Sequence, residues 1–257
     1  MPIRTPVVIE IDRKTWLVQE YGLDCCYAIL GERSGLLIDT GCGRMNIKAL
    51  AARLFEGRPY EVVLTHGHSH HAGGAGCYNE VYCADMVQRA VRDEAVSPDF
   101  IPPSFEGEDF VPECLPLHTG DEFDLGGRVV RCIRTPGHTA GSCSFYDEQS
   151  GIAFVGDACG RTLKANEAVS DMLTGLMNLK RMTPGLDRLY PGHVSYTDYR
   201  GLPVSVLEDA ICACRAALAP DGRHYHVDGK AVFRSVSLEY AKKWADLEPC
   251  SPYPLGL

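Results

Sequence analysis

The fold of this chain is signalled most strongly by residues 65–74, which have the sequence THGHSHHAGG. Four of the nine histidines fall within residues 66–71, immediately after the short apolar run Glu61–Leu64, which fits a buried strand. A His-x-His pair in an extended turn can direct both imidazoles at one ion, while the next two histidines point elsewhere as the chain enters a helix. We therefore expect this single segment to supply ligands to two adjacent metal ions.

The rest of the ligand set has to come from other loops. Zinc and similar metals bind neutral imidazole nitrogen readily, and a catalytic zinc site keeps one position open for water or substrate. Three candidate ligands follow predicted strands, namely His138 in TPGHTAGS, Asp157 in FVGDA and His193 in YPGH. A glycine precedes each of them, which permits a tight turn or a close backbone approach that a Cβ atom would hinder.

Strands and helices alternate on both sides of the histidine segment. Sheets covered by helices are therefore expected, and no linker-like boundary interrupts residues 1–257, which favours a single domain. The apolar patterns predict strands at Val7–Ile11, Thr15–Gln19, Cys25–Leu30, Leu36–Ile38, Arg128–Arg134, Ser142–Asp147, Ile152–Val155 and Arg188–Tyr190, and a short strand pair around Tyr225–Phe233. They predict helices at Asn46–Phe55, Met86–Ala95, Leu173–Met182 and Val204–Ala219.

The stretch Ser97–Pro112 is rich in proline, glycine and acidic residues, which excludes regular structure. A loop of this length inside a domain is often an active-site lid. A surface loop without a role is the alternative.

The composition excludes several kinds of partner. The 257 residues include 34 acidic and 25 basic ones, giving a net charge of −9, without a basic run that could follow a nucleic acid. The first residues, MPIRTPVVIEIDRKTW, are not typical of a targeting peptide, and no stretch approaches the roughly 20 apolar residues of a membrane span. We expect a cytoplasmic enzyme acting on a small molecule, with no nucleic acid or membrane involved. The oligomeric state stays open.

The twelve cysteines are dispersed and form no CxxC pair, which argues against a zinc ribbon, a thioredoxin-type motif or an iron–sulfur cluster. Most are predicted to be reduced thiols that pack as small hydrophobic side chains. Cys159, beside Asp157, receives the same interpretation in preference to a role as nucleophile.

The motifs LLIDTG, THGHSHHAGG, TPGHTAGS, FVGDA and PGH, in this order, resemble those of the metallo-β-lactamase fold superfamily. The resemblance runs from about Val7 to His193. It implies an α/β fold, a four-layer αββα sandwich with the metal site at one edge of two facing mixed sheets. It also implies the following roles: His66, His68 and His138 bind the first metal, His71 and His193 bind the second, Asp157 bridges the two, and Asp39 lies beneath the site.

His70 is the departure from the family pattern, which has aspartate at this position in HxHxDH. The exchange replaces an anionic oxygen donor by a neutral nitrogen donor. Three outcomes are open: His70 binds the second metal, it misses that metal and leaves a weakened position, or it marks a site that has lost catalysis. We predict the first, with His70 and Asp157 both taking part in catalysis.

Two adjacent divalent ions can lower the pKa of a water molecule to about 7 and so supply hydroxide at neutral pH. The expected enzyme is a dinuclear hydrolase, with zinc as the favoured metal and iron or manganese as alternatives. The resemblance is nearest to the glyoxalase II and lactonase-like branch, which implies a small ester, thioester or lactone as substrate. Four side chains could stabilise an oxyanion, and the sequence does not rank them: Tyr190, Tyr196, Lys164 and Asn166.

Two other classes of function remain open. The same scaffold carries non-haem iron in persulfide dioxygenases, and the segment DACGRT after Asp157 is faintly similar to one in those enzymes. A non-catalytic metal-binding relative is the second alternative, because of His70. A GxSxG motif is absent, which argues against a serine triad.

Overall fold

A computed structural model of the chain describes residues 6–20, 22, 24–43, 45–84, 112–193, 199–218, 230–233 and 236–240. The predicted helix at Met86–Ala95 lies outside the described residues. So do the predicted loop at Ser97–Pro112, apart from Pro112 itself, and Tyr196.

The first sheet has seven strands in sequence order, antiparallel from β1 to β4 and parallel from β4 to β7. Helix α1 (Ile47–Leu54) joins β4 to β5, because parallel neighbours need a crossover connection. It begins at Asn46, whose side chain accepts a hydrogen bond from the Ala49 amide. The strands are β1 (Val7–Asp12), β2 (Thr15–Glu20), β3 (Asp24–Leu30), β4 (Gly35–Ile38), β5 (Tyr60–Val63), β6 (Glu80–Cys83) and β7 (Glu113–Pro116).

The second sheet has six strands in the order β14-β13-β11-β10-β9-β8. Strands β11 and β13 are parallel, and the connection between them contains helix α4 (Val169–Met182). Helix α5 (Ser205–Leu218) follows β14. The strands are β8 (Glu122–Asp124), β9 (Val129–Arg134), β10 (Cys143–Asp147), β11 (Ile152–Gly156), β13 (Arg188–Pro191) and β14 (Leu202–Pro203).

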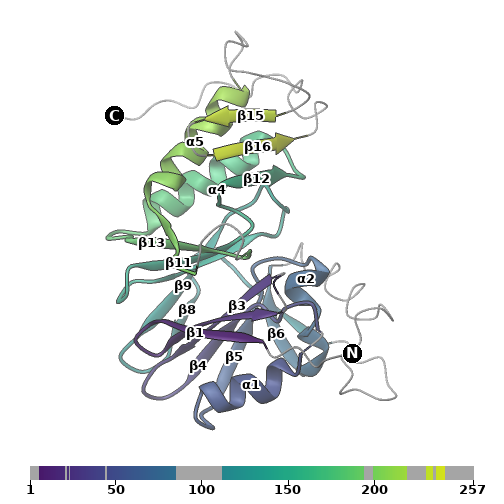
Figure 1. The fold of residues 1–257 in the computed structure, drawn as a ribbon, viewed down its shortest axis with the longest axis vertical. Coiled ribbons are helices and arrows are strands. Elements are labelled where there is room, and N and C mark those ends of the chain that lie inside the picture. The colour runs from purple at the N-terminus through teal and green to yellow at the C-terminus, as the bar shows by residue number, and fades with distance from the viewer. Residues whose placement is uncertain are drawn as a thin grey trace.

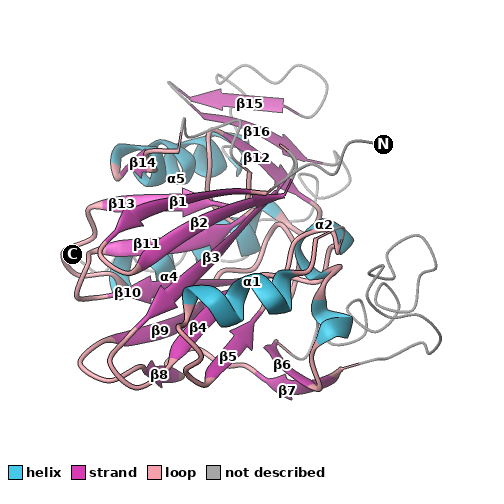
Figure 2. Cartoon of the chain, turned by 60° about the horizontal axis from the view of Figure 1, so that its bottom comes forward, coloured by secondary structure: helices cyan, strands magenta, loops and turns pink. Residues whose placement is uncertain are grey.

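The two sheets face each other, and helices cover their outer faces (Figures 1 and 2). Strand β11 shows how the sequence produces these layers, since successive side chains of a strand point to opposite faces. Ile152 and Phe154 belong to the core between the sheets. Ala153 and Val155 belong to a second core that also contains the apolar faces of α4 and α5. The predicted αββα sandwich is therefore confirmed.

A third, small sheet was not predicted. It has the order β12-β16-β15, with β12 (Thr162–Ala165) parallel to β16 (Val236–Tyr240), and β16 antiparallel to β15 (Lys230–Phe233). Of the strand pair predicted around Tyr225–Phe233, residues 225–229 lie outside the described residues, whereas residues 230–233 form β15 and its antiparallel partner β16 follows Phe233. In Figure 1 this sheet lies beside α5, at the end of the molecule opposite α1.

The remaining elements agree with the prediction to within a few residues, apart from several strands of two to four residues that were missed: β6, β7, β8 and β14. Helix α4 begins at Val169, earlier than the predicted Leu173, because Val169 and Met172 extend its buried face. Ten of the eleven described cysteines are buried, as expected of thiols packed as small hydrophobic groups. None of the helices in the described ranges is long and apolar enough to cross a membrane.

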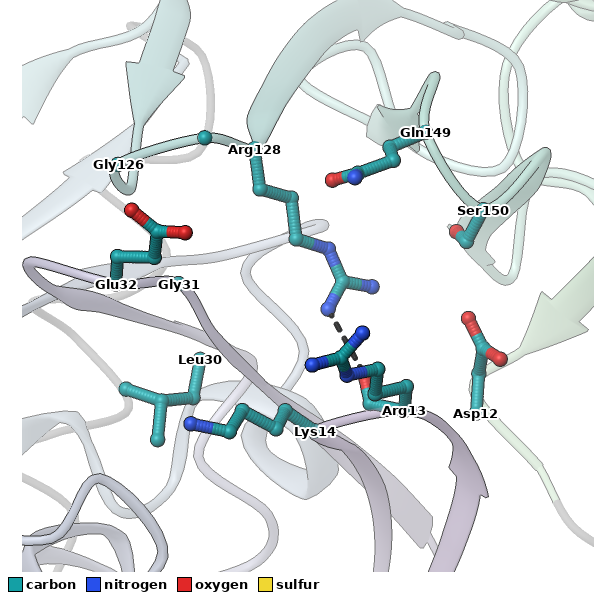
Figure 3. Close-up of a pocket in the computed structure, with 11 residues that line it drawn as sticks. Asp12, Arg13, Lys14, Leu30, Gly31, Glu32, Gly126, Arg128, Gln149 and Ser150 are labelled. Carbon is teal, nitrogen blue, oxygen red and sulfur yellow. Dashed lines mark hydrogen bonds between the residues drawn. The ribbon is translucent and has the colours of Figure 1, made fainter.

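A buried arginine connects the two sheets at the end away from the histidines. Arg128, just before β9, donates hydrogen bonds from its guanidinium to Asp147, to Thr15 Oγ1 at 2.7 Å and to the Arg13 carbonyl at 3.1 Å. Figure 3 shows this side chain bending over Arg13 in a polar cavity of about 330 Å³. The guanidinium of Arg128 is hydrogen-bonded to Asp147 in the second sheet and to Thr15 in the first. Arg128 therefore holds the two sheets together.

Candidate metal centre

All seven predicted site residues lie where strands end. His66 and His68 follow β5, and His70 and His71 lie in the short helix α2 (Ser69–Ala72). His138, Asp157 and His193 follow β9, β11 and β13 respectively. These three strands run in one direction, because β9 and β11 are both antiparallel to β10 and β13 is parallel to β11. The ligand candidates of both sheets therefore meet at one edge of the sandwich.

Two backbone hydrogen bonds join the sheets next to these residues. The Cys143 amide, at the start of β10, donates to the Thr65 carbonyl at 2.7 Å. The Cys25 amide in β3 donates to the Gly192 carbonyl at 2.8 Å. The histidine segment and the loop that carries His193 are thus fixed relative to each other by main-chain contacts.

His66, His68 and His138 form the first donor group. The Nδ1 atom of His68 lies 3.0 Å from His66 Nε2 and 3.0 Å from His138 Nε2. Burial lowers the pKa of His66 well below its ordinary value, lowers that of His68 to about 4 and lowers that of His138. These imidazoles are therefore neutral at pH 7, the form that binds metals.

The hydrogen bonds around His138 fix its tautomer. Its Nδ1 atom lies 2.9 Å from the Lys164 carbonyl, which can only accept, so Nδ1 carries the proton. The Nε2 atom consequently presents a lone pair to the first donor group. In many metal sites, a hydrogen bond at one ring nitrogen of a histidine determines that the other ring nitrogen binds the metal.

The second donor group surrounds His71, which is fully buried. Its Nδ1 atom lies 3.2 Å from Asp39 Oδ2, while Nε2 lies 3.5 Å from Asp157 Oδ1 and has no hydrogen-bond partner among the described residues. Asp39 is itself held by the Thr65 amide at 2.7 Å and hydroxyl at 2.8 Å. Asp39 therefore lies beneath the site, as the family resemblance implied.

Asp157 lies between the two donor groups. Its Oδ2 atom is 3.4 Å from His138 Nε2 and 3.2 Å from His193 Nε2. Burial raises the pKa of Asp157, but the surrounding His193, His70 and His71 outweigh burial and hold the pKa well below its ordinary value. Asp157 is therefore an anion that faces both groups, the arrangement expected of a bridging ligand.

His70 reaches the second group but is its most exposed histidine, with 36% of the side chain accessible. Its Nε2 atom lies 4.0 Å from Asp157 Oδ2, and it shares a potential ligand set with His66, His71 and Asp157. The position is thus adjacent to the site, as predicted. Metal binding by His70 remains a prediction.

The sequence interpretation missed Asp24, at the start of β3. Asp24 is 2% exposed and forms a further potential ligand set with His70, His71 and His193. Every residue of β3 is buried, so a carboxylate at its first position was the available signal. The strand was predicted to begin at Cys25, which left Asp24 in the preceding turn.

The glycines before the ligand candidates are required, as expected. A Cβ atom at Gly192 would lie 2.3 Å from His71 Cε1 and 2.9 Å from Asp157 Oδ1. Gly156 has φ +48°, and a Cβ atom there would lie 2.5 Å from Thr65 Oγ1. Only glycine therefore lets the backbone at position 192 approach the second donor group, and the backbone at position 156 approach Thr65, so closely.

A cavity of about 680 Å³ opens onto the donor groups. Lys164 and Asn166 line it beside His68, His70 and Asp157, so two of the four candidates for oxyanion stabilisation are in place. Tyr190 is not, because its ring is buried against Tyr27 and Phe154 in the core between the sheets. This candidate was therefore wrong.

Cys159 also borders this cavity, but its side chain is only 1% exposed. Burial raises the pKa of its thiol to about 12, which keeps the thiol protonated at neutral pH. The interpretation of Cys159 as a packed thiol is supported.

The donor set fits divalent metal ions. Imidazole nitrogens converge on a buried carboxylate, and the Nε2 atom of His71 is buried without a hydrogen-bond partner among the described residues. Imidazole with few carboxylates suits zinc, iron, copper or nickel better than magnesium or calcium. The structure thus brings together all seven predicted residues, and their binding of metal remains a prediction.

The sequence matches the model of the Metallo-beta-lactamase superfamily over residues 25–78 and 87–205. The chain belongs to this family. The matched segments contain all seven site residues, together with Asp39.

Curated relatives include proteins with and without an assigned activity. An uncharacterized protein of Mycobacterium tuberculosis, Rv2581c, is 31% identical over 67% of this chain and 86% of its own length. A protein of Bacillus velezensis named probable polyketide biosynthesis zinc-dependent hydrolase BaeB is 29% identical over 51% of this chain and 55% of its own. A hydroxyacylglutathione hydrolase of Brucella anthropi is 31% identical over 49% and 51%. The chain thus spans only about half the length of the two relatives with an assigned activity.

Solved structures confirm the fold. A metallo-beta-lactamase from Pontibacter korlensis superposes with a TM-score of 0.63, covering 82% of this chain and 99% of its own, at 18% identity. The metallo-beta-lactamase FIM-1 from Pseudomonas aeruginosa, in its mono-zinc form, gives 0.60 over 82% and 96%, at 14% identity. At these identities the likeness concerns the fold alone.

Proposed function

We propose that this protein is a dinuclear metal-dependent hydrolase that acts on a small ester, thioester or lactone. The observation that carries the proposal is Asp157, an anionic carboxylate between two histidine donor groups at the wall of a cavity. The names of two relatives, a zinc-dependent hydrolase and a hydroxyacylglutathione hydrolase, agree with this class of reaction. The small-molecule partner and the cytoplasmic location remain predictions from the sequence.

The first metal would be held by His66, His68 and His138, and the second by His70, His71 and His193, with Asp157 between them. Zinc is favoured by the imidazole-rich donor set and by the name of the BaeB relative. When bound, two such ions supply hydroxide at neutral pH and polarise a substrate carbonyl.

The residues of the cavity would bind and orient the substrate. Lys164 and Asn166 lie on or just after β12 and place an ammonium and a carboxamide near the donor groups. Both can donate hydrogen bonds to a developing oxyanion, which is where electrostatic stabilisation contributes most to acyl-group hydrolysis. Asp157 would not deliver a proton at neutral pH, since its pKa is held low.

The test is metal analysis of protein purified without added metal, followed by turnover of thioester, lactone, phosphodiester and β-lactam substrates. We expect two equivalents of zinc and hydrolysis of a thioester, ester or lactone. Bound iron with oxygen uptake on a persulfide substrate would instead support the dioxygenase alternative. Full metal occupancy without turnover of any substrate would support a non-catalytic metal-binding protein.

The role of Lys164 is tested separately with Lys164→Met, which keeps an unbranched side chain and removes its charge. Under the proposal this variant retains both metals and loses activity, by about 10²–10³-fold if Lys164 serves as an oxyanion donor. Unchanged activity would remove Lys164 from the proposed machinery.

A further inference from the structure

Asp24 is a buried carboxylate with two contacts at the second donor group. Its Oδ1 atom lies 3.3 Å from His193 Nδ1, and its Oδ2 atom accepts a hydrogen bond from the Cys42 thiol at 2.9 Å. The Cys42 amide donates to Glu20 Oε2 at 2.5 Å, so the segment that holds Asp24 is itself fixed. Asp24 is therefore held in place against His193.

The pairs Asp24–His193 and Asp39–His71 have the same arrangement. In each pair a buried carboxylate faces the Nδ1 atom of a histidine, and the Nε2 atom of that histidine faces Asp157, at 3.2 Å for His193 and 3.5 Å for His71. A carboxylate behind Nδ1 fixes the tautomer, orients the ring and increases the basicity of Nε2. The second donor group thus has a carboxylate behind two of its three histidines.

The charge balance gives these carboxylates a second role. Two divalent ions bring four positive charges, whereas the imidazoles bring none and Asp157 brings one negative charge. This excess of positive charge is unfavourable in free energy in a buried site unless nearby negative groups compensate it. At the second group, position 70 offers a neutral ring. Asp24 belongs to one potential ligand set of this group and Asp39 contacts its His71, so both carboxylates can offset part of the charge of the metal.

We propose that Asp24 is a positioning residue of the second metal position: it orients His193 through Nδ1 and supplies the negative charge that the side chain at position 70 does not. This inference rests on the proposed dinuclear site. It explains how a second metal can be held with histidine at position 70.

The test is a cycle of four proteins: the natural chain, Asp24→Asn, His70→Asp and the double variant. The readouts are zinc stoichiometry, the dissociation constant of each equivalent, and the visible spectrum of the cobalt-substituted protein. Asp24→Asn should weaken the second equivalent by about 10–100-fold and leave the first unchanged, as is usual when a contact behind a metal ligand is lost. In the double variant, the carboxylate at position 70 should restore the second equivalent to within several-fold of the natural chain.

A matched control is Asp124→Asn, which removes a carboxylate from an exposed pair with Arg33 and should change neither equivalent. If Asp24→Asn binds the second zinc equivalent as tightly as the natural chain does, the inference is wrong. It is also wrong if His70→Asp fails to restore the loss.

If Asp24→Asn alone does not fold, His70→Asp and the double variant still test the inference, because Asp24 should be dispensable once position 70 carries a carboxylate. If the double variant binds the second zinc equivalent much more weakly than His70→Asp does, the inference is wrong. A natural chain that binds only one metal would instead overturn the dinuclear site of the proposed function.

Discussion

The Nδ1 atom of His71 lies 3.2 Å from Oδ2 of Asp39, and both side chains are fully buried. This contact leaves His71 Nε2 as the atom that faces Asp157. Asp39 also accepts two hydrogen bonds from Thr65, the residue before His66. One carboxylate therefore sets the geometry of a second-group histidine and the start of the histidine segment.

Replacing Asp39 by Asn tests this role. Asp39 has φ +62°, and Asn tolerates that backbone conformation, so the fold should be retained. Loss of the negative charge behind His71 should weaken the second zinc equivalent by about 10–100-fold, measured by competition with a chromophoric chelator. Equal affinity in the variant and the natural chain would show that the charge of Asp39 has no influence on the metal.

Replacing Gly192 by Ala should disrupt the second donor group. The new Cβ atom would collide with His71 and Asp157. The backbone cannot shift away, because the Gly192 amide donates a hydrogen bond to the Gly156 carbonyl and the Gly192 carbonyl accepts one from the Cys25 amide. We expect at least about tenfold weaker binding of the second equivalent. Gly160→Ala is the matched control, since its Cβ atom would meet nothing closer than 3.7 Å. Equal metal binding by the two variants would contradict the prediction.

The stability of the metal-free protein should fall as pH rises from 6.5 to 9. Burial lowers the pKa of His71, but Asp157 and Asp39 outweigh burial and raise it to about 9, against an ordinary 6.5. A group whose pKa is raised on folding contributes stability that is complete below the unfolded pKa and is lost as pH rises through the folded pKa. The loss should amount to at most about 3 kcal/mol of unfolding free energy.

The measurement is urea unfolding of metal-free and zinc-loaded protein at several pH values. A metal ligand has to be deprotonated, so the loaded protein has no His71 proton to lose and the gap between the two forms should widen with pH. Buried thiols also titrate on unfolding, but they do so in both forms and cancel in the difference. A gap that stays constant between pH 6.5 and 9 would contradict the assignment.

Replacing Asp147 by Ala should destabilise the protein without affecting metal binding. Asp147 is fully buried and pairs with Arg128, which would be left as an uncompensated buried charge. The expected loss of unfolding free energy is about 3–5 kcal/mol. Asp124→Ala breaks an exposed pair with Arg33, which water and salt screen, and should leave the free energy of unfolding nearly unchanged. Similar losses for the two variants would show that burial of the pair does not matter.

The sequence predicted most of the site because its residues are adjacent in the chain or follow strong strand signals. His66 to His71 form one segment, and each of the other candidate ligands stands after a glycine at the end of an apolar run. Asp24 stands outside the histidine segment and has no glycine directly before it, so neither of these two patterns marked it. Its role arises from contacts with Cys42 and His193, which are distant in sequence, so only the folded structure could bring it into the site.

The long strands and helices were predicted for the same reason, since their apolar periodicity extends over many residues. Strands β8 and β14 have two or three residues, too few for a periodic pattern. Strand β12 pairs with β16, which comes more than one helix later in the chain, so its pairing depends on tertiary structure. Tyr190 was misjudged because a tyrosine near a ligand in sequence can still point into the core.

Each donor group combines histidines from the first sheet with a residue from the second, since His138, Asp157 and His193 follow strands of the second sheet and the others follow β5. A bound metal would therefore act as a cross-link between the two halves of the chain. Two separately produced fragments, divided between β7 and β8, would each carry only part of each donor group. Their reassembly into one molecule should accordingly depend on the metal and be reversed by a chelator.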